Sequence, residues 1–227
     1  MAGCCPSSAA DMAAPTLVFD LDGTLSDPAE GIGRSLNHAL TLHGYPEIPA
    51  TAFGSCVGPG LDVSFQRWAG DLPEPRLKAL VAAYRDRYAT VGLFENVLYP
   101  GIPEALQALT ELGVPLGVCT TKLPQVAERI LVHFGLRHHF DFVSGGDVGI
   151  PKSRQLGELL EAGRIDARAT MIGDRDLDIA AGRAHGLRTV GVLWGHGGRA
   201  ELERAGADHL VASPRELPQL ADASSGL

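Results

Sequence analysis

The chain has few cysteines and no long apolar run. It contains four cysteines, of which Cys4 and Cys5 are adjacent, and this spacing suits neither a disulfide framework nor a zinc site. No segment approaches the roughly 20 consecutive apolar residues that a membrane span requires. Residues 1–15 carry no Lys or Arg and no apolar block, so they predict a disordered tail rather than a secretory signal. We therefore expect a reducing, cytoplasmic location and no membrane partner.

Positive charge is also scarce, with 19 Lys and Arg against 27 Asp and Glu and a formal net charge of −8. Nucleic acids and anionic lipid surfaces would repel such a chain, so we expect no nucleic-acid partner. An acidic protein can still hold a cationic pocket, which leaves an anionic small molecule as a candidate ligand. With 227 residues and 45% hydrophobic residues, the chain is long and apolar enough for a large domain carrying a smaller insertion.

Short apolar runs alternate with helical patterns over most of the chain. The run at 17–19 has no alternating polar residue, which predicts a strand buried on both faces of a parallel sheet. Further strands are predicted at 116–119, 142–144, 170–172 and 188–192, and helices at 103–112, 125–134, 153–162 and 179–185. This alternation predicts an α/β fold with a doubly wound, Rossmann-like parallel sheet.

A long helical pattern follows the first strand and interrupts this alternation. Asp27, Pro28 and Glu30 match the N-cap, the first helical position and the capping-box position of a helix. Two further helices are predicted at 61–68 and 74–90, where Tyr84 and Tyr88 belong to an apolar stripe. We expect a core formed by residues 16–26 and 96–220, with an all-helical cap inserted at 27–95.

Polar side chains follow four of the predicted strands, at the edge where ligands bind in doubly wound sheets. In chain order they are Asp20, Asp22 and Thr24, then Thr120, Thr121 and Lys122, then Lys152, then Asp174, Asp176 and Asp178. Acids that converge repel one another without a cation, and ligation by oxygen alone points to Mg²⁺. Hydroxyl and ammonium groups beside them suit a phosphoryl group. One acid could then form an aspartyl-phosphate while a second transfers protons.

Each of these signals has an ordinary explanation when it stands alone. Asp22-Gly23 could be a hairpin turn, although the flanking run at 17–19 does not alternate as a hairpin strand would. Thr120 could be a strand-end hydroxyl, and Lys152 a solvated charge. The regular order, in which each group follows a strand of one predicted sheet, is what indicates a single site.

The sequence Phe19-Asp20-Leu21-Asp22-Gly23-Thr24-Leu25 resembles the first motif of the haloacid-dehalogenase superfamily of phosphatases. Thr120 resembles its second motif, Lys152 its third, and Gly173-Asp174 through Asp178 its fourth. The likeness extends from Thr16 to Leu217. Gly58-Pro59-Gly60 and the segments 95–103 and 192–197 are similar to the branch of phosphoglycolate phosphatases and 5′-nucleotidases, which has a helical cap.

The resemblance implies a role for each matching residue. Asp20 would be the nucleophile, and Asp22 would protonate the leaving alcohol and then activate water. Mg²⁺ would be held by Asp20, the backbone carbonyl of Asp22, Asp174 and Asp178. Thr120 would bind a phosphoryl oxygen, and backbone amides after Asp20 would help to cradle the phosphate.

The third motif departs from the family pattern, because its lysine is usually followed by proline, whereas here Pro151 precedes Lys152. The chain has only three lysines, and Lys78 falls in the expected cap. Lys152 is the preferred candidate, with Lys122 and Arg154 as alternatives. Thr121, Lys122 and Arg154 are further candidates for binding substrate, as is Arg34, since an anionic leaving group would favour a cation near the first cap helix.

The function that these observations favour is a Mg²⁺-dependent phosphomonoester hydrolase of a small soluble metabolite, similar to phosphoglycolate phosphatase. Nucleoside 5′-monophosphates, sugar phosphates and pyrophosphate stay open as substrates, and both a monomer and a homodimer stay open. A phosphomutase or a non-catalytic phosphate-binding scaffold is the alternative. A dehalogenase would lack the second acid, which Asp22 supplies here. The loop after 188–192, with Trp194 and His196, is expected to be a flexible connection at the edge of the site.

Overall fold

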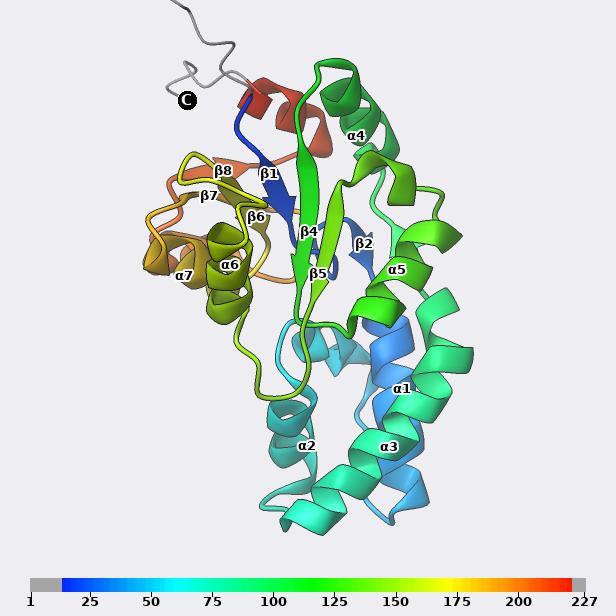
Figure 1. The fold of residues 1–227 in the computed structure, drawn as a ribbon. Helices are drawn as coiled ribbons and strands as arrows, with labels where there is room; N and C mark the ends of the chain where they lie inside the picture. Colours follow the sequence, from blue (N-terminus) through cyan, green and yellow to red (C-terminus); the bar gives the residue numbers. More distant parts are fainter. Residues whose placement is uncertain (1–13, 222–227) are drawn as a thin grey trace, which may run out of the picture.

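The structure is a computed structural model that describes residues 14–221. Most of the expected disordered tail, including Cys4 and Cys5, lies outside the described residues. Figure 1 shows a central sheet with helices on both sides and a group of helices beyond one end of its strands.

Six parallel strands form the central sheet, in the order β5-β4-β1-β6-β7-β8. Their bounds are β1 Leu17–Phe19, β4 Leu116–Thr120, β5 Phe142–Gly145, β6 Thr170–Gly173, β7 Arg188–Val192 and β8 His209–Val211. The order of the strands reverses beside β1, which is where a doubly wound sheet opens a crevice for ligands. The doubly wound α/β core predicted from the sequence is thus confirmed.

Strand β1 is the centre of the hydrophobic core because it is buried on both faces. Leu17 and Phe19 pack into one cluster with residues of α4 (Ile102–Glu111) and α5 (Pro124–His133). Val18 points to the opposite face and packs with residues of α6 (Lys152–Glu161) and α7 (Asp176–Ala184). Figure 1 shows these two pairs of helices on opposite sides of the sheet. A continuous apolar run is therefore the pattern that this position needs.

The helices that follow β1 lie beyond the sheet rather than on its faces (Figure 1). They are α1 Ala29–Leu42, η1 Ala50–Cys56, α2 Leu61–Ala69, α3 Glu74–Thr90 and η2 Gly92–Phe94. We call residues 29–94 the helical segment. Its two connections to the core pair as a short antiparallel ribbon of β2 (Ser26–Asp27) and β3 (Val97–Leu98). Strands of two residues carry no periodicity, so the sequence could not predict this ribbon.

The start of α1 differs from the prediction. Asp27 belongs to β2, and α1 begins at Ala29 after Pro28. The side chain of Asp27 still accepts a hydrogen bond from the N–H of Ala29, at 3.0 Å. Glu30 forms no capping box and instead pairs with Arg34 one turn later, at 2.6 Å. The ribbon takes the place of a free helix start, which is why the local capping pattern misplaced the boundary by one residue.

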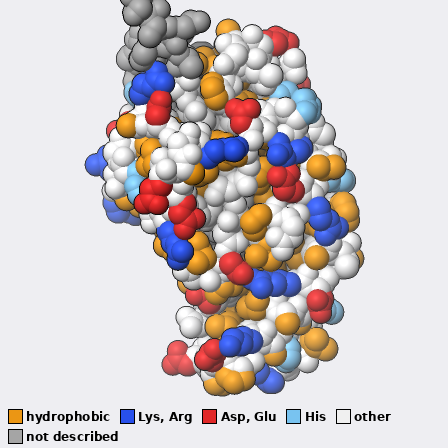
Figure 2. Space-filling model, viewed as in Figure 1, with side chains coloured by type: hydrophobic (Ala, Val, Ile, Leu, Met, Phe, Trp, Pro, Cys, Tyr) orange, Lys and Arg blue, Asp and Glu red, His pale blue; other side chains and the backbone are white. Residues whose placement is uncertain are grey.

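The remaining helices of the core are short: η3 Arg137–His139, α8 Arg199–Ala205 and η4 Pro214–Ala221. Among residues 14–221, no helix combines the length and apolar character that crossing a bilayer demands. On the face drawn in Figure 2, acidic and basic side chains are interspersed rather than gathered into one large patch of either sign.

Candidate active site

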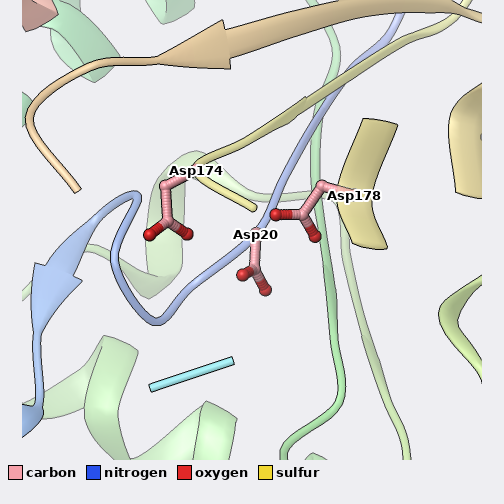
Figure 3. A group of neighbouring side chains, drawn as sticks. All are labelled: Asp20, Asp174 and Asp178. Carbon is pink, nitrogen blue, oxygen red and sulfur yellow. The ribbon is translucent and has the colours of Figure 1, made fainter. Parts of the chain in front are cut away.

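Three aspartates meet at the carboxyl end of the sheet (Figure 3). Asp20 directly follows β1, Asp174 follows β6, and Asp178 lies in the first turn of α7. Because β1 and β6 pair in parallel, the loops that follow them emerge side by side. One carboxylate oxygen from each residue lies within 4.8 Å of the others, and all three side chains are buried. The structure thus brings together three of the four metal ligands predicted from the sequence.

Burial and mutual repulsion govern the protonation of this acidic cluster. Burial raises the pKa of Asp174, and the charges of Asp178 and Asp20 raise it further. Burial likewise raises the pKa of Asp178, although Lys152 opposes this shift. Both carboxyl groups therefore hold a proton more tightly than an exposed aspartate does, as expected where like charges share a poorly solvated site.

Lys152 places one positive charge inside the cluster. It begins α6, and its Nζ lies 2.9 Å from Asp20 Oδ1 and also donates to Asp178 Oδ1. Burial acts to lower the pKa of Lys152, but the two carboxylates outweigh burial and raise it, so the ammonium group stays charged. One ammonium against three carboxylates leaves the ionised cluster two negative charges in excess.

The donor set fits a hard divalent cation. Asp174 Oδ2 accepts a hydrogen bond from the backbone N–H of His196 at 2.8 Å, whereas Asp174 Oδ1 is buried and has no partner among the described residues. A buried carboxylate oxygen without a partner is costly unless a proton or a cation reaches it. Carboxylate oxygens are the ligands that Mg²⁺ prefers in proteins, and two excess charges match its valence.

Asp22 lies in the same loop as Asp20 but forms an ion pair with a different lysine, Lys122. Its Oδ2 is 2.9 Å from Nζ of Lys122, which also donates to the hydroxyl of Tyr88 at 2.9 Å. Asp22 Oδ1 is buried and without a partner in the part of the chain that the structure describes. Thr120, buried at the end of β4, accepts a hydrogen bond from the backbone N–H of Lys122 at 3.3 Å. Lys122 and Lys152, which were both candidates for the third-motif lysine, thus contact different acids.

Gly23 lets the Asp20 loop turn tightly against Asp174. Its φ is +87°, a conformation that favours glycine, and an added Cβ would lie 2.3 Å from Asp174 Oδ2. The indole N–H of Trp194 fixes the same turn by donating to the carbonyl oxygen of Thr24 at 2.9 Å. Any larger residue at position 23 would push the two acids apart.

A cleft of about 730 Å³ lies between these loops and the helical segment. Its core side includes Asp20, Asp22, Thr121, Lys122, Lys152 and Asp178, and its other side includes Gly58, Leu61, Tyr84, Arg85 and Tyr88. Two contacts cross it besides that of Lys122 with Tyr88. Arg85 pairs with Asp147 at 2.5 Å, and Arg175 donates to the carbonyl oxygen of Val57.

Two of the predicted substrate-binding residues are not among the described residues that line this cleft. Arg34 pairs with Glu30 and, at 2.9 Å, with Glu95. Arg154 points to solvent, with 62% of its side chain exposed, and pairs with Glu158 at 2.9 Å. Both residues lie on helices, and the sequence alone does not show which face of a helix is turned toward a distant site.

Arg175 and Tyr88 line the cleft although the sequence assigned neither to the site, and His196 binds the acidic cluster from a loop that was expected only at the edge of the site. The backbone of His196 binds Asp174, and its ring nitrogen Nε2 lies 2.9 Å from Asp27 Oδ1, which lowers the pKa of Asp27. Trp194 and His196 thus join the loop after β7 to the Asp20 loop and to Asp174. The position of this loop after a strand was the available signal for His196.

Residues 17–192 match the family described as haloacid dehalogenase-like hydrolase. The chain belongs to this family. It is 35% identical to a 5′-nucleotidase of Pseudomonas aeruginosa, over 91% of this chain and 95% of that protein. It is 38% identical to a phosphoglycolate phosphatase of Rhodobacter capsulatus, over 78% of this chain and 83% of that protein.

Two further similarities complete the comparison. The tyrosine-protein kinase PtkA of Mycobacterium tuberculosis is 35% identical, over 91% of this chain and 71% of that protein. A crystal structure of a predicted phosphatase from Clostridium acetobutylicum superimposes with a TM-score of 0.85 at 33% identity, covering 91% of this chain and 97% of that one. The family match and the relatives named 5′-nucleotidase and phosphoglycolate phosphatase show that the chain is a phosphatase of the haloacid dehalogenase-like hydrolases.

Proposed function

We propose that this hydrolase is a Mg²⁺-dependent phosphomonoesterase that works through an aspartyl-phosphate on Asp20. One observation carries the proposal: Asp20 lines the cleft, belongs to the cluster with Asp174 and Asp178, and lies 2.9 Å from the ammonium group of Lys152. The side chains of the three aspartates and the backbone carbonyl of Asp22 would hold Mg²⁺. When bound, the ion would neutralise charge on the phosphoryl oxygens.

Each residue then has a defined task. A carboxylate oxygen of Asp20 attacks phosphorus as the bond from phosphorus to the leaving oxygen breaks, and Asp22 gives its proton to that oxygen. In the second step Asp22 takes a proton from water, whose oxygen bonds to phosphorus while the bond to Asp20 breaks. Lys152 balances charge at Asp20 and at the phosphoryl group, which supports its assignment to the third motif over Lys122 and Arg154.

Residues 27–95 would act as a cap over a core formed by 16–26 and 96–220. The contacts that cross the cleft support this division, since each joins the helical segment to a loop of the core. A cap that closes over the site would exclude bulk water and admit small substrates. We therefore propose a small soluble phosphate ester as the substrate, and phosphoglycolate as the first candidate because of the relatives that carry that name.

A nucleoside 5′-monophosphate is the second candidate, and the size of the cleft favours it. A space of about 730 Å³ falls in the range of pockets that hold drug-sized ligands, which is larger than a two-carbon acid needs. The rings of Tyr84 and Tyr88 lie parallel, with centroids 5.3 Å apart, and both residues line this space. Aromatic side chains suit a nucleobase better than a carboxylate, and the 5′-nucleotidase relative agrees with this preference.

The test is phosphate release with Mg²⁺ from phosphoglycolate, nucleoside 5′-monophosphates, sugar phosphates and pyrophosphate, with Asp20→Asn as the control. We expect turnover by the wild type and a loss of at least about 10³-fold in Asp20→Asn, since the nucleophile has no substitute. The substrate with the highest kcat/KM decides between the candidates. Comparable turnover by Asp20→Asn would refute the role of Asp20, and wild-type protein that binds Mg²⁺ without hydrolysing any ester would favour a mutase or a scaffold.

A further inference from the structure

The contacts of Lys122 are not used by the phosphatase chemistry outlined above. Its ammonium group touches two partners from different parts of the fold: Asp22 Oδ2 at 2.9 Å and the hydroxyl of Tyr88 at 2.9 Å. The first belongs to the loop after β1, and the second to α3 of the helical segment. Only 9% of the Lys122 side chain is exposed, so both contacts are shielded from solvent.

The two oxygens of the Asp22 carboxylate have different surroundings. Oδ2 accepts from Lys122, while Oδ1 is buried and has no partner among residues 14–221. Leaving a buried carboxylate oxygen unpartnered costs free energy, so such an atom is uncommon in a folded protein. Asp22 also lines the cleft beside Asp20. Lys122 thus holds the Asp22 carboxylate through one oxygen, at the wall of the cleft where the proposed reaction needs an acid.

We propose that Lys122 is a positioning residue that holds the Asp22 carboxyl group in place for its proton transfers, and that Tyr88 fixes Lys122 in turn. This inference rests on the proposed function, because it concerns the acid and base of that reaction. Asp22 gives its proton to the leaving oxygen as the phosphoryl group passes to Asp20. Asp22 then takes a proton from the water that releases the phosphoryl group from Asp20.

The surroundings of Tyr88 explain how a flexible lysine can be held in one place. Tyr88 is 3% exposed, and its ring stacks on that of Tyr84 with 10° between the planes. Lys122 Nζ lies 4.3 Å from the centroid of the Tyr88 ring, within the range of a cation–π contact. A lysine side chain loses considerable rotamer freedom when it is ordered, and two anchors on one ammonium group offset that loss.

The pairing also links the acid to the docking of the helical segment. Tyr88, which contacts Lys122, lies on α3 of the helical segment, whereas Asp22 lies in a loop at the edge of the sheet. A shift of α3 away from the sheet would remove one of the two partners that hold Lys122 beside Asp22.

Leaving-group dependence tests this role, because p-nitrophenolate departs without a proton and an alkoxide does not. We would measure kcat/KM for an alkyl phosphate and for p-nitrophenyl phosphate in Lys122→Met and Tyr88→Phe. Misplacing a catalytic group costs up to about 10²-fold. We expect Lys122→Met to lose about 10- to 100-fold with the alkyl ester and less than about 3-fold with the aryl ester. Tyr88→Phe should shift the same ratio by a smaller factor.

Matched variants separate this role from others. Lys78→Met removes an exposed ammonium group from the same helix as Tyr88. It should not change the ratio between the two esters. Partial recovery of the ratio in Lys122→Arg would support positioning. If Lys122→Met does not fold, the ratio in Tyr88→Phe decides.

An equal loss on both esters, or a rise in KM alone, would overturn the inference and make Lys122 a ligand of the phosphoryl group. The proposed function fails by a different result, namely Asp20→Asn that hydrolyses both esters as fast as the wild type. That result would also remove the reaction in which Asp22 acts. The two failures are thus told apart by the Asp20 variant.

Discussion

Single residues in the acidic cluster set what the site can bind. Asp20 and Asp178 share the ammonium group of Lys152, whereas among residues 14–221 the carboxylate of Asp174 accepts a hydrogen bond only from the backbone N–H of His196. Charges that are buried interact more strongly than charges in water, so the loss of any one of them changes the whole cluster. The pKa values of Asp174 and Asp178 are both raised, so each of these acids holds its proton more tightly than an exposed aspartate does.

Replacing Lys152 with methionine tests its role while keeping the length of the side chain. Without the ammonium group, Asp20 and Asp178 would face each other as buried carboxylates. We expect kcat/KM for phosphate release to fall about 10²- to 10³-fold, the loss typical for removal of one group that stabilises transition-state charge. Steady-state assays at saturating Mg²⁺ measure the effect.

Lys78→Met is the matched control, because Lys78 is exposed and pairs with Glu74 within one helix. Its kcat/KM should stay within about 2-fold of the wild type, as for an exposed pair of this kind. Equal losses in the two variants would show that Lys152 has no special part in turnover.

At the scale of elements, the turn between η1 and α2 joins the helical segment to the core. Arg175, just before α7, donates to the carbonyl oxygen of Val57 and pairs with Glu201 at 2.8 Å. The next residue, Gly58, has a φ of +100°, and a Cβ there would lie 2.8 Å from Nη1 of Arg175. Glycine at this position therefore permits the positive φ and also leaves room for the side chain of Arg175.

Gly58→Ala should lower both stability and activity. The left-handed conformation alone costs alanine about 1–2 kcal/mol, and the clash with Arg175 adds to it. We expect kcat/KM to fall at least about 3-fold, since Gly58 and Arg175 both line the cleft. Chemical denaturation measures the free energy of unfolding, and phosphate release on the same preparation measures kcat/KM.

Gly70→Ala isolates the backbone contribution. Gly70 has a similar φ of +79°, but apart from its chain neighbours no heavy atom of the described residues lies within 4 Å of its added Cβ. With ψ at −163°, Gly70 lies in a region that is essentially restricted to glycine, so this variant should lose about 1–3 kcal/mol of stability and keep its activity. If Gly58→Ala matches Gly70→Ala in both measurements, the side chain of Arg175 can move aside without further loss of stability or activity.

The same scale shows what sequence patterns can and cannot predict. The run at 17–19 and the acids that follow it predicted β1, the sheet and the meeting of Asp20 with Asp174, because a parallel sheet places strand ends together. The pairing of Lys122 with Tyr88 joins residues 34 positions apart on a helix and a loop, and no periodicity encodes it. Arg34 was assigned toward substrate from its place in the chain, yet Glu30 and Glu95 hold it elsewhere.

For the whole molecule, metal binding and folding should be coupled. The ligand candidates come from the loops after β1 and β6 and from α7, so the cluster exists only when the core is assembled. A cation that binds only the folded state stabilises it by mass action, by about 2.7 kcal/mol at 100 times its Kd. For a chain of this size, that corresponds to a rise in Tm of about 5–10 °C.

Mg²⁺ titrated into protein freed of metal with EDTA should therefore raise Tm, and fresh EDTA should reverse the rise. Differential scanning calorimetry measures both. Asp174→Asn provides the sharpest comparison, because it removes one buried negative charge and keeps the size of the side chain. Without metal it should melt a few degrees above the wild type, since Asp178 and Asp20 no longer repel a charge at this position.

With Mg²⁺ the order should reverse, because the asparagine variant lacks the carboxylate whose Oδ1 has no other partner in the described chain. Its Tm should hardly respond to the ion while that of the wild type rises past it. A destabilised Asp174→Asn protein without metal would show that the charge of Asp174 is satisfied without a cation. An equal response of both proteins to Mg²⁺ would place the ion elsewhere. The crossing of the two melting temperatures is the result that only a cation bound at Asp174 produces.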